Sequence, residues 1–393
     1  MSLIPALRPS QVGKLNERQV LRVIQSRGPL SRAEVARQSG LSAPTVSKAV
    51  ASLIVAGLLE EAEPDDSAPG RGRPAPKLRV ASAWVQVLGV VIDAGHCTVT
   101  SAGLDGVMHP ESLATVPTPR TYAALLTALT TRCRAAVDKP GVTTLGLGLS
   151  LPGLIDHPTG TGVLSPNVPI TNGQTPAADL GTRLGLPAVH IQESHALCLA
   201  ERDHGLAVGL TDFAMMDAST GIGLGVMSGG RLLLGTRGLA GELGHMTVVA
   251  ENGPRCGCGN EGCLEAIASD AALATRVAAR VGEPVSVDDV VEMARAGRPE
   301  VAAELPLTAR YLAIGVGTVI NLFNPSTVFI HSRLFEAVPG LFEQVVELAR
   351  GRSLPPTLRD CEIVRARGNK PQGAVAGIVQ HLTNAVAPGL EHV

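Results

Sequence analysis

The chain has 393 residues, of which 45% are hydrophobic and 17% are charged, and its formal net charge is -2. This is the composition of an ordinary soluble globular protein, and the length exceeds the roughly 250 to 300 residues at which a single core stops growing, so two or three domains are expected. Of the seven cysteines, three are clustered and four are scattered singly, which fits a reducing cytosol better than a disulfide framework.

Neither the N-terminus nor the apolar runs predict export or a membrane span. The first ten residues lack the basic start and the long apolar run of a signal peptide. The longest candidate membrane segment, residues 311–323, is shorter than the roughly 18 to 20 apolar residues that span a bilayer, and we expect it to form a buried helix. The sequence therefore predicts a cytoplasmic protein without a membrane partner.

Charge is distributed unevenly along the chain. Residues 1–82 hold 12 Lys and Arg against 7 Asp and Glu, whereas the remaining residues hold 21 against 28. A basic N-terminal part on an acidic body predicts a nucleic-acid contact that is confined to one end of the protein.

Three short helices are predicted in this basic part. The first covers residues 14–27, where apolar side chains recur on one helical face. Ser31 and Glu34 have the spacing of a capping box for the second helix. Ser42 can cap the third helix, which tolerates Pro44 because that proline lies in the first turn. This succession is the pattern of a helix-turn-helix.

A wing is predicted to follow these helices. Residues 58–62 and 77–80 have the pattern of two strands, and the basic turn between them suits a narrow minor groove. The alternative is a small helical interaction domain with a solvated linker. The predicted DNA contacts are Ser42, Ala43, Thr45, Ser47 and Lys48 in the third helix and Arg71 and Arg73 in the wing.

From residue 85 onward the sequence predicts an α/β fold. The opening group of strands recurs after residue 210, which indicates two related lobes with a ligand cleft between them. The predicted domains are residues 1–82, 83–205 and 206–393. We expect strands at 85–93, 97–102, 107–113, 145–150, 213–217, 224–227, 231–234, 327–330 and 362–365, and helices at 121–137, 271–281, 287–296, 301–323, 336–350 and 372–386.

Residues 241–269 gather the residue types that bind zinc. A structural zinc ion takes four ligands in a tetrahedron, and three cysteines with one histidine are a standard set. We expect Gly257, Gly259 and Gly262 to adopt positive φ values in a loop that a bound metal would order. The alternative is three free thiols beside a surface histidine. The predicted ligands are His245, Cys256, Cys258 and Cys263.

The same stretch resembles the ROK family (repressors, open reading frames and sugar kinases), in particular its regulators of the xylose-repressor and N-acetylglucosamine-repressor type. The resemblance covers essentially the whole chain. It implies a winged helix-turn-helix followed by a two-lobed actin-like, or ribonuclease-H-like, domain. The most specific matching residues are Glu242-Leu243-Gly244-His245, Cys256-Gly257-Cys258-Gly259 and Gly262-Cys263-Leu264-Glu265.

The resemblance also implies a sugar site. In ROK kinases the E-x-G-H motif and the glutamate after the last zinc cysteine hold sugar hydroxyls, which here implies Glu242, His245 and Glu265 as ligand-binding residues. Gln192 and Glu193 stand where the kinases have further sugar contacts, and Gln192 can donate to a hydroxyl. The alternative is that the two glutamates, Glu242 and Glu265, only support the zinc ligands.

The catalytic motifs of the kinases are altered. Glu193 replaces the aspartate that takes the proton from the sugar, and the longer side chain displaces the carboxylate. The first phosphate motif is Asp93-Ala94-Gly95-His96-Cys97, in which an imidazole replaces a glycine that lets phosphate approach the backbone. A later glycine pair is His331-Ser332, although Thr220-Gly221-Ile222-Gly223 is retained. No ATP binding and no enzymatic activity are therefore expected.

The leading interpretation is a sugar-sensing transcriptional regulator, more a repressor than an activator, that binds operator DNA as a homodimer or a tetramer. Zinc would have a structural role. The first alternative is an active ATP-dependent sugar kinase with a DNA-binding head. The second is a regulator that recognises a protein partner instead of a sugar.

Overall fold

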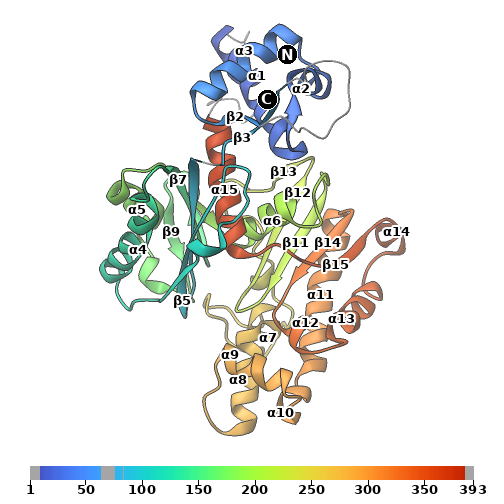
Figure 1. The fold of residues 1–393 in the computed structure, drawn as a ribbon. Helices are drawn as coiled ribbons and strands as arrows, with labels where there is room; N and C mark the ends of the chain where they lie inside the picture. Colours follow the sequence, from blue (N-terminus) through green and yellow to red (C-terminus); the bar gives the residue numbers. More distant parts are fainter. Residues whose placement is uncertain (1–8, 63–75, 83, 386–393) are drawn as a thin grey trace. The chain divides into compact units, whose positions relative to one another are not determined.

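The computed structural model describes residues 9–62, 76–82 and 84–385 (Figure 1). By internal contacts the chain divides into two compact units, which are described separately. Unit 1 contains residues 1–149, 177–189 and 374–393, and unit 2 contains residues 150–176 and 190–373. Both units are discontinuous in sequence, whereas the three predicted domains are the consecutive ranges 1–82, 83–205 and 206–393. The three-domain division stays a prediction about which parts fold independently.

The helix-turn-helix of unit 1 is formed by α1 (Pro9–Arg27), α2 (Arg32–Ser39) and α3 (Ala43–Val55). The predicted capping box of α2 is confirmed, because the Ser31 hydroxyl accepts a hydrogen bond from the Glu34 backbone and the Glu34 carboxylate accepts one from the Ser31 backbone at 2.8 Å. Ser42 caps α3, with Pro44 in its first turn. These local signals set the boundaries of α2 and α3.

The wing contains the two predicted strands, β2 (Leu59–Ala62) and β3 (Lys77–Val80), which pair antiparallel. A short strand that we did not expect, β1 (Leu30–Ser31), pairs with the other edge of β3 and makes a three-stranded sheet. The predicted contacts Arg71 and Arg73 lie outside the described residues.

The two lobes contain sheets with the same strand order. Counted within each sheet, the order is third, second, first, fourth and fifth, which confirms the predicted duplication. The strands of the first sheet are β4 (Val85–Ile92), β5 (His96–Ala102), β6 (Ala114–Pro117), β7 (Thr143–Leu151) and β10 (Ala188–Gln192); those of the second are β11 (Phe213–Ala218), β12 (Ile222–Ser228), β13 (Arg231–Leu232), β14 (Thr327–His331) and β15 (Glu362–Arg365). A separate hairpin contains β8 (Leu154–Asp156) and β9 (Thr161–Leu164).

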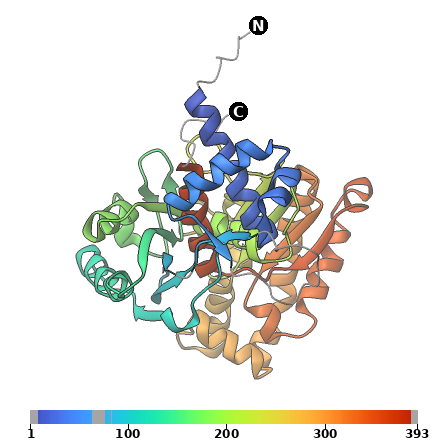
Figure 2. The ribbon, with the colours of Figure 1, turned by 45° about the horizontal axis from the view of Figure 1, so that its top comes forward.

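Helices α4 (Tyr122–Val137) and α5 (Pro176–Leu184) lie side by side on the first lobe (Figure 2). The Tyr122 hydroxyl donates a hydrogen bond to the Asp179 carboxylate at 2.5 Å. The remaining helices are α6 (Glu193–His204), α7 (Glu265–Ala268), α8 (Asp270–Val281), α9 (Val287–Arg295), α10 (Pro299–Ala302), α11 (Leu305–Phe323), α12 (Leu334–Ala337), α13 (Leu341–Arg350), α14 (Pro355–Leu358) and α15 (Lys370–Ala385), with short 3-10 turns η1 (Pro110–Ser112), η2 (Pro169–Thr171) and η3 (Leu243–His245).

Three predicted elements were wrong in extent. Residues 107–113 contain an isolated bridge from Met108 to Ala102 and then η1 instead of a strand, because Pro110 has no N–H to donate to a ladder, and the strand begins only at Ala114. The helix expected at 301–323 is divided into α10 and α11. The helix expected at 336–350 is divided into α12 and α13 by Gly340, whose φ of 85° does not continue a helix.

Helices α6 and α11 cover opposite faces of the second sheet. Side chains alternate along a strand; Gly223 and Gly225 leave room for α6 on one face, where a Cβ at Gly225 would lie 2.7 Å from that of Cys198. Met216 and Leu224 belong to the core on the other face, together with α11 and α13 (Figure 1).

Helix α11 has 19 residues and is the one helix among the described residues that is long and apolar enough to cross a membrane. It begins six residues earlier than the predicted segment 311–323, so the expectation that this apolar helix is too short to span a bilayer was wrong. The predicted burial is confirmed, because Leu312, Val316 and Ile320 are at most 1% exposed. This helix is the centre of the unit 2 core.

The C-terminal helix α15 begins in unit 2 and ends in unit 1. Val375 and Ile378 are fully buried in the same hydrophobic cluster as the helix-turn-helix residues Val20 and Ile24. The Gln25 amide donates a hydrogen bond to the Thr383 hydroxyl at 3.3 Å. Helix α15 therefore shares a hydrophobic core with the helix-turn-helix.

Candidate metal and effector site

The loop that carries Glu242 and His245 is fixed to the edge of β12. Gly241 has φ 96°, its carbonyl accepts a hydrogen bond from the Leu224 N–H at 2.9 Å, and a Cβ here would lie 1.9 Å from the Leu224 carbonyl oxygen. Only glycine fits that approach. The turn η3 then places Glu242 and His245, three residues apart, beside each other.

The cysteines are presented by a short hairpin. Cys256 donates its N–H to the Asn260 carbonyl at 2.8 Å, and Gly262 has φ 71° with its Cα packed against the Val249 backbone. Gly259 also has a positive φ, as predicted, whereas Gly257 does not, so that expectation was wrong for one of the three glycines. The turn needs the left-handed conformation only at Gly259 and Gly262.

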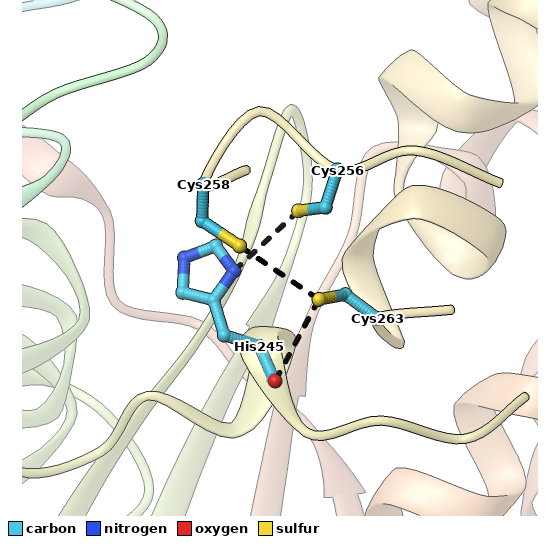
Figure 3. A group of neighbouring side chains, drawn as sticks. All are labelled: His245, Cys256, Cys258 and Cys263. Carbon is cyan, nitrogen blue, oxygen red and sulfur yellow. Dashed lines mark hydrogen bonds between the residues drawn. The ribbon is translucent and has the colours of Figure 1, made fainter. Parts of the chain in front are cut away.

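His245, Cys256, Cys258 and Cys263 converge, as predicted, on one point (Figure 3). Nδ1 of His245 lies 3.6 Å from Sγ of Cys256, and Sγ of Cys258 lies 3.8 Å from Sγ of Cys263. A tetrahedron with Zn–S bonds of about 2.3 Å and a Zn–N bond of about 2.0 Å has S–S edges of about 3.8 Å and S–N edges of about 3.5 Å. These two separations are close to such edges, and all four donor atoms lie within 4.8 Å of one another. The donor set therefore fits a tetrahedral metal ion.

The imidazole of His245 has a different neighbour at each nitrogen. Nδ1 faces the sulfurs, whereas Nε2 lies 3.7 Å from Oε2 of Glu242. With Nδ1 on a metal, Nε2 would carry the proton and could donate it to Glu242 or to a ligand. The geometry allows His245 to serve the metal and a ligand together.

Glu242 and Gln192 form the next part of the site. The Gln192 amide donates a hydrogen bond to Oε1 of Glu242 at 2.7 Å. Burial raises the pKa of Glu242 above its ordinary value, against the effect of this hydrogen bond. The amide oxygen of Gln192 is buried and has no partner among the described residues. A ligand hydroxyl can satisfy such an acceptor.

Glu265 closes the site from the other side of the cysteine hairpin. Its Oε2 accepts a hydrogen bond from the Ile222 N–H at 2.9 Å, and a Cβ at Gly221 would lie 2.7 Å from Oε2 and 3.7 Å from Nδ2 of Asn167. Asn167 was not among the predicted site residues, and its one signal in the sequence is its place beside Pro166 in a loop. Its side chain, with no hydrogen-bond partner among the described residues, adds an amide to the site.

Glu193, expected beside the sugar contacts, is committed to another partner. It begins α6 and forms an ion pair with Lys370, the first residue of α15. Both side chains are 15% exposed. A carboxylate held in this way has less freedom to accept a proton from a substrate hydroxyl.

The residues that replace the nucleotide motifs also have structural partners. Nδ1 of His331 lies 2.9 Å from Oδ1 of Asp217 on the neighbouring strand. Burial acts to raise the pKa of Asp217, but the hydrogen bond with His331 lowers it below its ordinary value. In unit 1, Cys97 is fully buried with its thiol 3.5 Å from the Thr118 hydroxyl, while His96 is exposed.

Asp270 is a buried carboxyl without a hydrogen-bond partner in the described part of the chain. It is 1% exposed, and burial together with the nearby charge of Asp217 raises its pKa to about 7. Between its ordinary pKa and this value the folded protein binds more protons than the unfolded chain, so stability falls as pH rises through this range.

We expect Asp270→Asn to stabilise the protein more at pH 8 than at pH 5, because asparagine cannot ionise. The difference in unfolding free energy between variant and wild type should widen by on the order of 1 to 3 kcal/mol across this interval. Urea unfolding at the two pH values measures it. Asp360→Asn, at an exposed position, is the matched control, and an equal difference at both pH values for Asp270→Asn would contradict the expectation.

The predicted DNA contacts of the third helix lie along the start of α3. Ser42, Ala43, Ser47 and Lys48 are exposed, whereas Thr45 is half-buried. The hydroxyls of Ser42 and Thr45 lie 2.8 Å apart, and Ser42 also caps the helix. Ser47 and Lys48 take no part in the cap, and their exposed side chains are available to a DNA groove. All five contacts on α3 stay predictions.

The fold and the site together define a winged helix joined to a two-lobed, kinase-type α/β domain. Residues 88–382 match the model of the ROK family, and residues 14–68 match that of the MarR family. The chain belongs to the ROK family.

Relatives with this arrangement match almost end to end. The DNA-binding transcriptional dual regulator NagC of Escherichia coli K12 is 28% identical, covering 97% of this chain and 96% of its own. The xylose repressor of Bacillus spizizenii is 27% identical, covering 95% and 97%.

Among solved structures, a regulator matches almost the whole chain, whereas a kinase matches about three quarters of it. A ROK family transcriptional regulator, described as a homolog of the E. coli MLC protein, is 26% identical with a TM-score of 0.80, covering 96% of this chain and 98% of its own. The ROK hexokinase of Thermus thermophilus, at 30% identity and a TM-score of 0.61, covers 75% of this chain and 97% of its own.

Proposed function

We propose that the protein is a DNA-binding transcriptional regulator of carbohydrate metabolism, acting as a repressor, that senses a sugar or sugar derivative. The observation that carries this proposal is a MarR-type winged helix joined to a ROK domain in which Glu242 lies beside His245 and close enough to Glu265 to feel its charge. Relatives that match along almost the whole chain carry the names of regulators and repressors, which supports the same conclusion.

We propose that the metal is a structural Zn²⁺ held by His245, Cys256, Cys258 and Cys263. Glu242 precedes the histidine by three residues, and Glu265 follows the last cysteine by two. A metal that fixes both segments would also fix the spacing of the two carboxylates, so its role is to make the effector site rigid.

The sugar would be held by donors and acceptors that differ in kind. Glu242 and Glu265 accept hydrogen bonds from hydroxyls, whereas the amide of Asn167 and Nε2 of His245 can donate to sugar oxygens. Gln192 offers a buried acceptor oxygen at the edge of the site. Several directional partners around one small volume favour a polyhydroxylated ligand over an apolar one.

We further propose that the protein does not transfer phosphate and takes no ATP. The ion pair of Glu193 with Lys370 supports this, because a kinase would need the carboxylate at this position free to accept a proton. The pairing of His331 with Asp217 also supports it, because the kinases have a glycine without a side chain where His331 stands. Phosphate transfer from ATP and magnesium to any sugar in a panel of hexoses, pentoses and amino sugars would contradict it.

The partner would be duplex operator DNA, read in the cytoplasm by a homodimer or by a tetramer that offers two winged helices to two half-sites. Effector binding would release the DNA only if the effector has unequal affinity for the two conformations of the protein.

The effector role is tested by Glu242→Gln, which keeps the size of the side chain and removes its charge. We expect the variant to bind DNA as the wild type does and to lose at least about tenfold in sugar affinity, because a charged acceptor becomes a neutral amide. Calorimetry with the sugar panel and fluorescence anisotropy with a selected operator measure both. Glu362→Gln, on an exposed side chain, is the control. If the wild-type protein shows no sequence-specific DNA binding, the proposed function is wrong.

A further inference from the structure

A cavity of about 560 Å³ in unit 2 shares one end with the proposed sugar site. Asn167 and Glu265 line this end, and both also contribute to the polar cluster described above. From there the cavity continues between the cysteine hairpin and helices α8 and α11. Glu242, His245 and Gln192 do not line it, so most of its volume lies beyond the residues that would hold a sugar ring.

The far part of the cavity has an apolar wall. Ile267, Leu307 and Tyr311 line it together with Ala271 and Ala272 of α8. An aromatic ring and aliphatic side chains favour the burial of an apolar ligand group, and the aliphatic side chains offer no hydrogen bond to a ligand hydroxyl. This part therefore differs in chemistry from the polar end at Asn167 and Glu265.

The cationic side chains at the cavity are already paired. Nε of Arg276 lies 2.8 Å from Oε2 of Glu304, and its Nη2 donates to the Thr308 hydroxyl at 2.7 Å. Nε of Arg255 lies 3.5 Å from Oε1 of Glu261, on the exposed hairpin. Arg276 is held by Glu304, and Arg255 is largely exposed to water, so neither offers a free buried cation to a phosphate or carboxylate in the far part, and the lining favours a neutral group.

We propose that the effector is a sugar that bears a neutral, partly apolar substituent. The ring would lie against Glu242, His245 and Glu265, and the substituent would pass Asn167 and lie against Tyr311 and the first turns of α8. The inference rests on the proposed function, since it extends the ligand of the same site. The cavity volume is in the range of roughly 300 to 1,000 Å³ that accommodates ligands larger than a single sugar ring.

The test compares matched sugars that differ only in the substituent. For glucose, xylose and N-acetylglucosamine, the methyl glycoside and the phenyl glycoside are titrated by calorimetry and by thermal shift of the full-length protein. We expect the phenyl form of at least one sugar to bind about tenfold or more tightly than its methyl form, because the ring fills the apolar part.

Ala272→Leu should remove this preference, because the larger side chain fills the far part without touching the polar cluster. The phenyl glycoside should then bind no better than the methyl glycoside, whose affinity should not change. Ala302→Leu, at an exposed position outside the cavity, is the control. If Ala272→Leu does not fold, Thr275→Leu, on an exposed side chain of the same lining, makes the same comparison.

The outcomes separate this inference from the proposed function. If methyl and phenyl glycosides bind the wild type equally, or if Ala272→Leu weakens both alike, the substituent does not occupy the cavity, and the sugar-sensing function is untouched. If no sugar binds in either form, the proposed function fails together with the inference.

Discussion

A Cys258→Ser variant is expected to purify with less than about a tenth of the zinc of the wild type, which should hold about one ion per chain. Serine is a poor ligand for zinc, and the three remaining donors leave the tetrahedron incomplete. Because the metal fixes the segments that carry Glu242 and Glu265, we also expect the response to sugar to be lost. Elemental analysis of the dialysed protein and calorimetry measure the two effects.

The matched control is Cys361→Ala, which removes a buried thiol that lies outside the cluster. It should keep a full complement of zinc, and its loss of stability reports the cost of an ordinary core substitution. Unchanged metal content in Cys258→Ser would refute the ligand assignment. Normal sugar binding by a zinc-free Cys258→Ser protein would instead refute the role of the metal in the effector site.

The double variant Arg71→Ala, Arg73→Ala should bind its operator about 10 to 100 times more weakly at physiological salt. If Arg71 and Arg73 lie in the wing as predicted, their guanidinium groups can enter a minor groove and neutralise phosphates, so their removal reduces counterion release. The slope of log affinity against log salt concentration should become less steep by about 0.9 for each phosphate that the variant no longer neutralises. Anisotropy titrations over a salt series, with duplexes selected from a random library, provide the slope.

Arg350→Ala, Arg359→Ala is the control for this charge change, because both side chains are exposed and belong to unit 2, whereas the winged helix belongs to unit 1. It should leave affinity and salt slope unchanged. If the wing variant behaves like this control, the arginines have no part in DNA binding, and the predicted contacts on α3 would have to supply it alone.

The helix-turn-helix could be predicted from sequence because its signals are local. Ser31 and Glu34 satisfy the first N–H groups of α2, and Ser42 does the same for α3, over a distance of three residues. The cluster of His245 and the cysteines was also recognisable, because all four ligands fall within a stretch of 19 residues. The metal donor set thus depends on short-range geometry.

The rest of the site depends on contacts between distant segments. Glu193 and Lys370 are 177 positions apart, and no periodicity in either segment indicates their ion pair. Asn167 and Glu265 are 98 positions apart, and both side chains lie next to Gly221, where a Cβ would come within 2.7 Å of the Glu265 carboxylate. The division of the helix expected at 336–350 had a sequence signal, Pro339-Gly340, but apolar periodicity on both sides of it outweighed that signal.

The shared core of α15 and the winged helix affects the order in which the protein can be completed on the ribosome. Val20 and Ile24 are among the first residues made, whereas Val375 and Ile378, which belong to the same hydrophobic cluster, are among the last. At about 5 to 20 residues per second, the intervening chain takes roughly 15 to 70 s to synthesise. The hydrophobic cluster that the winged helix shares with α15 is therefore complete only when translation is nearly finished, so a chain truncated before α15 would lack part of this core.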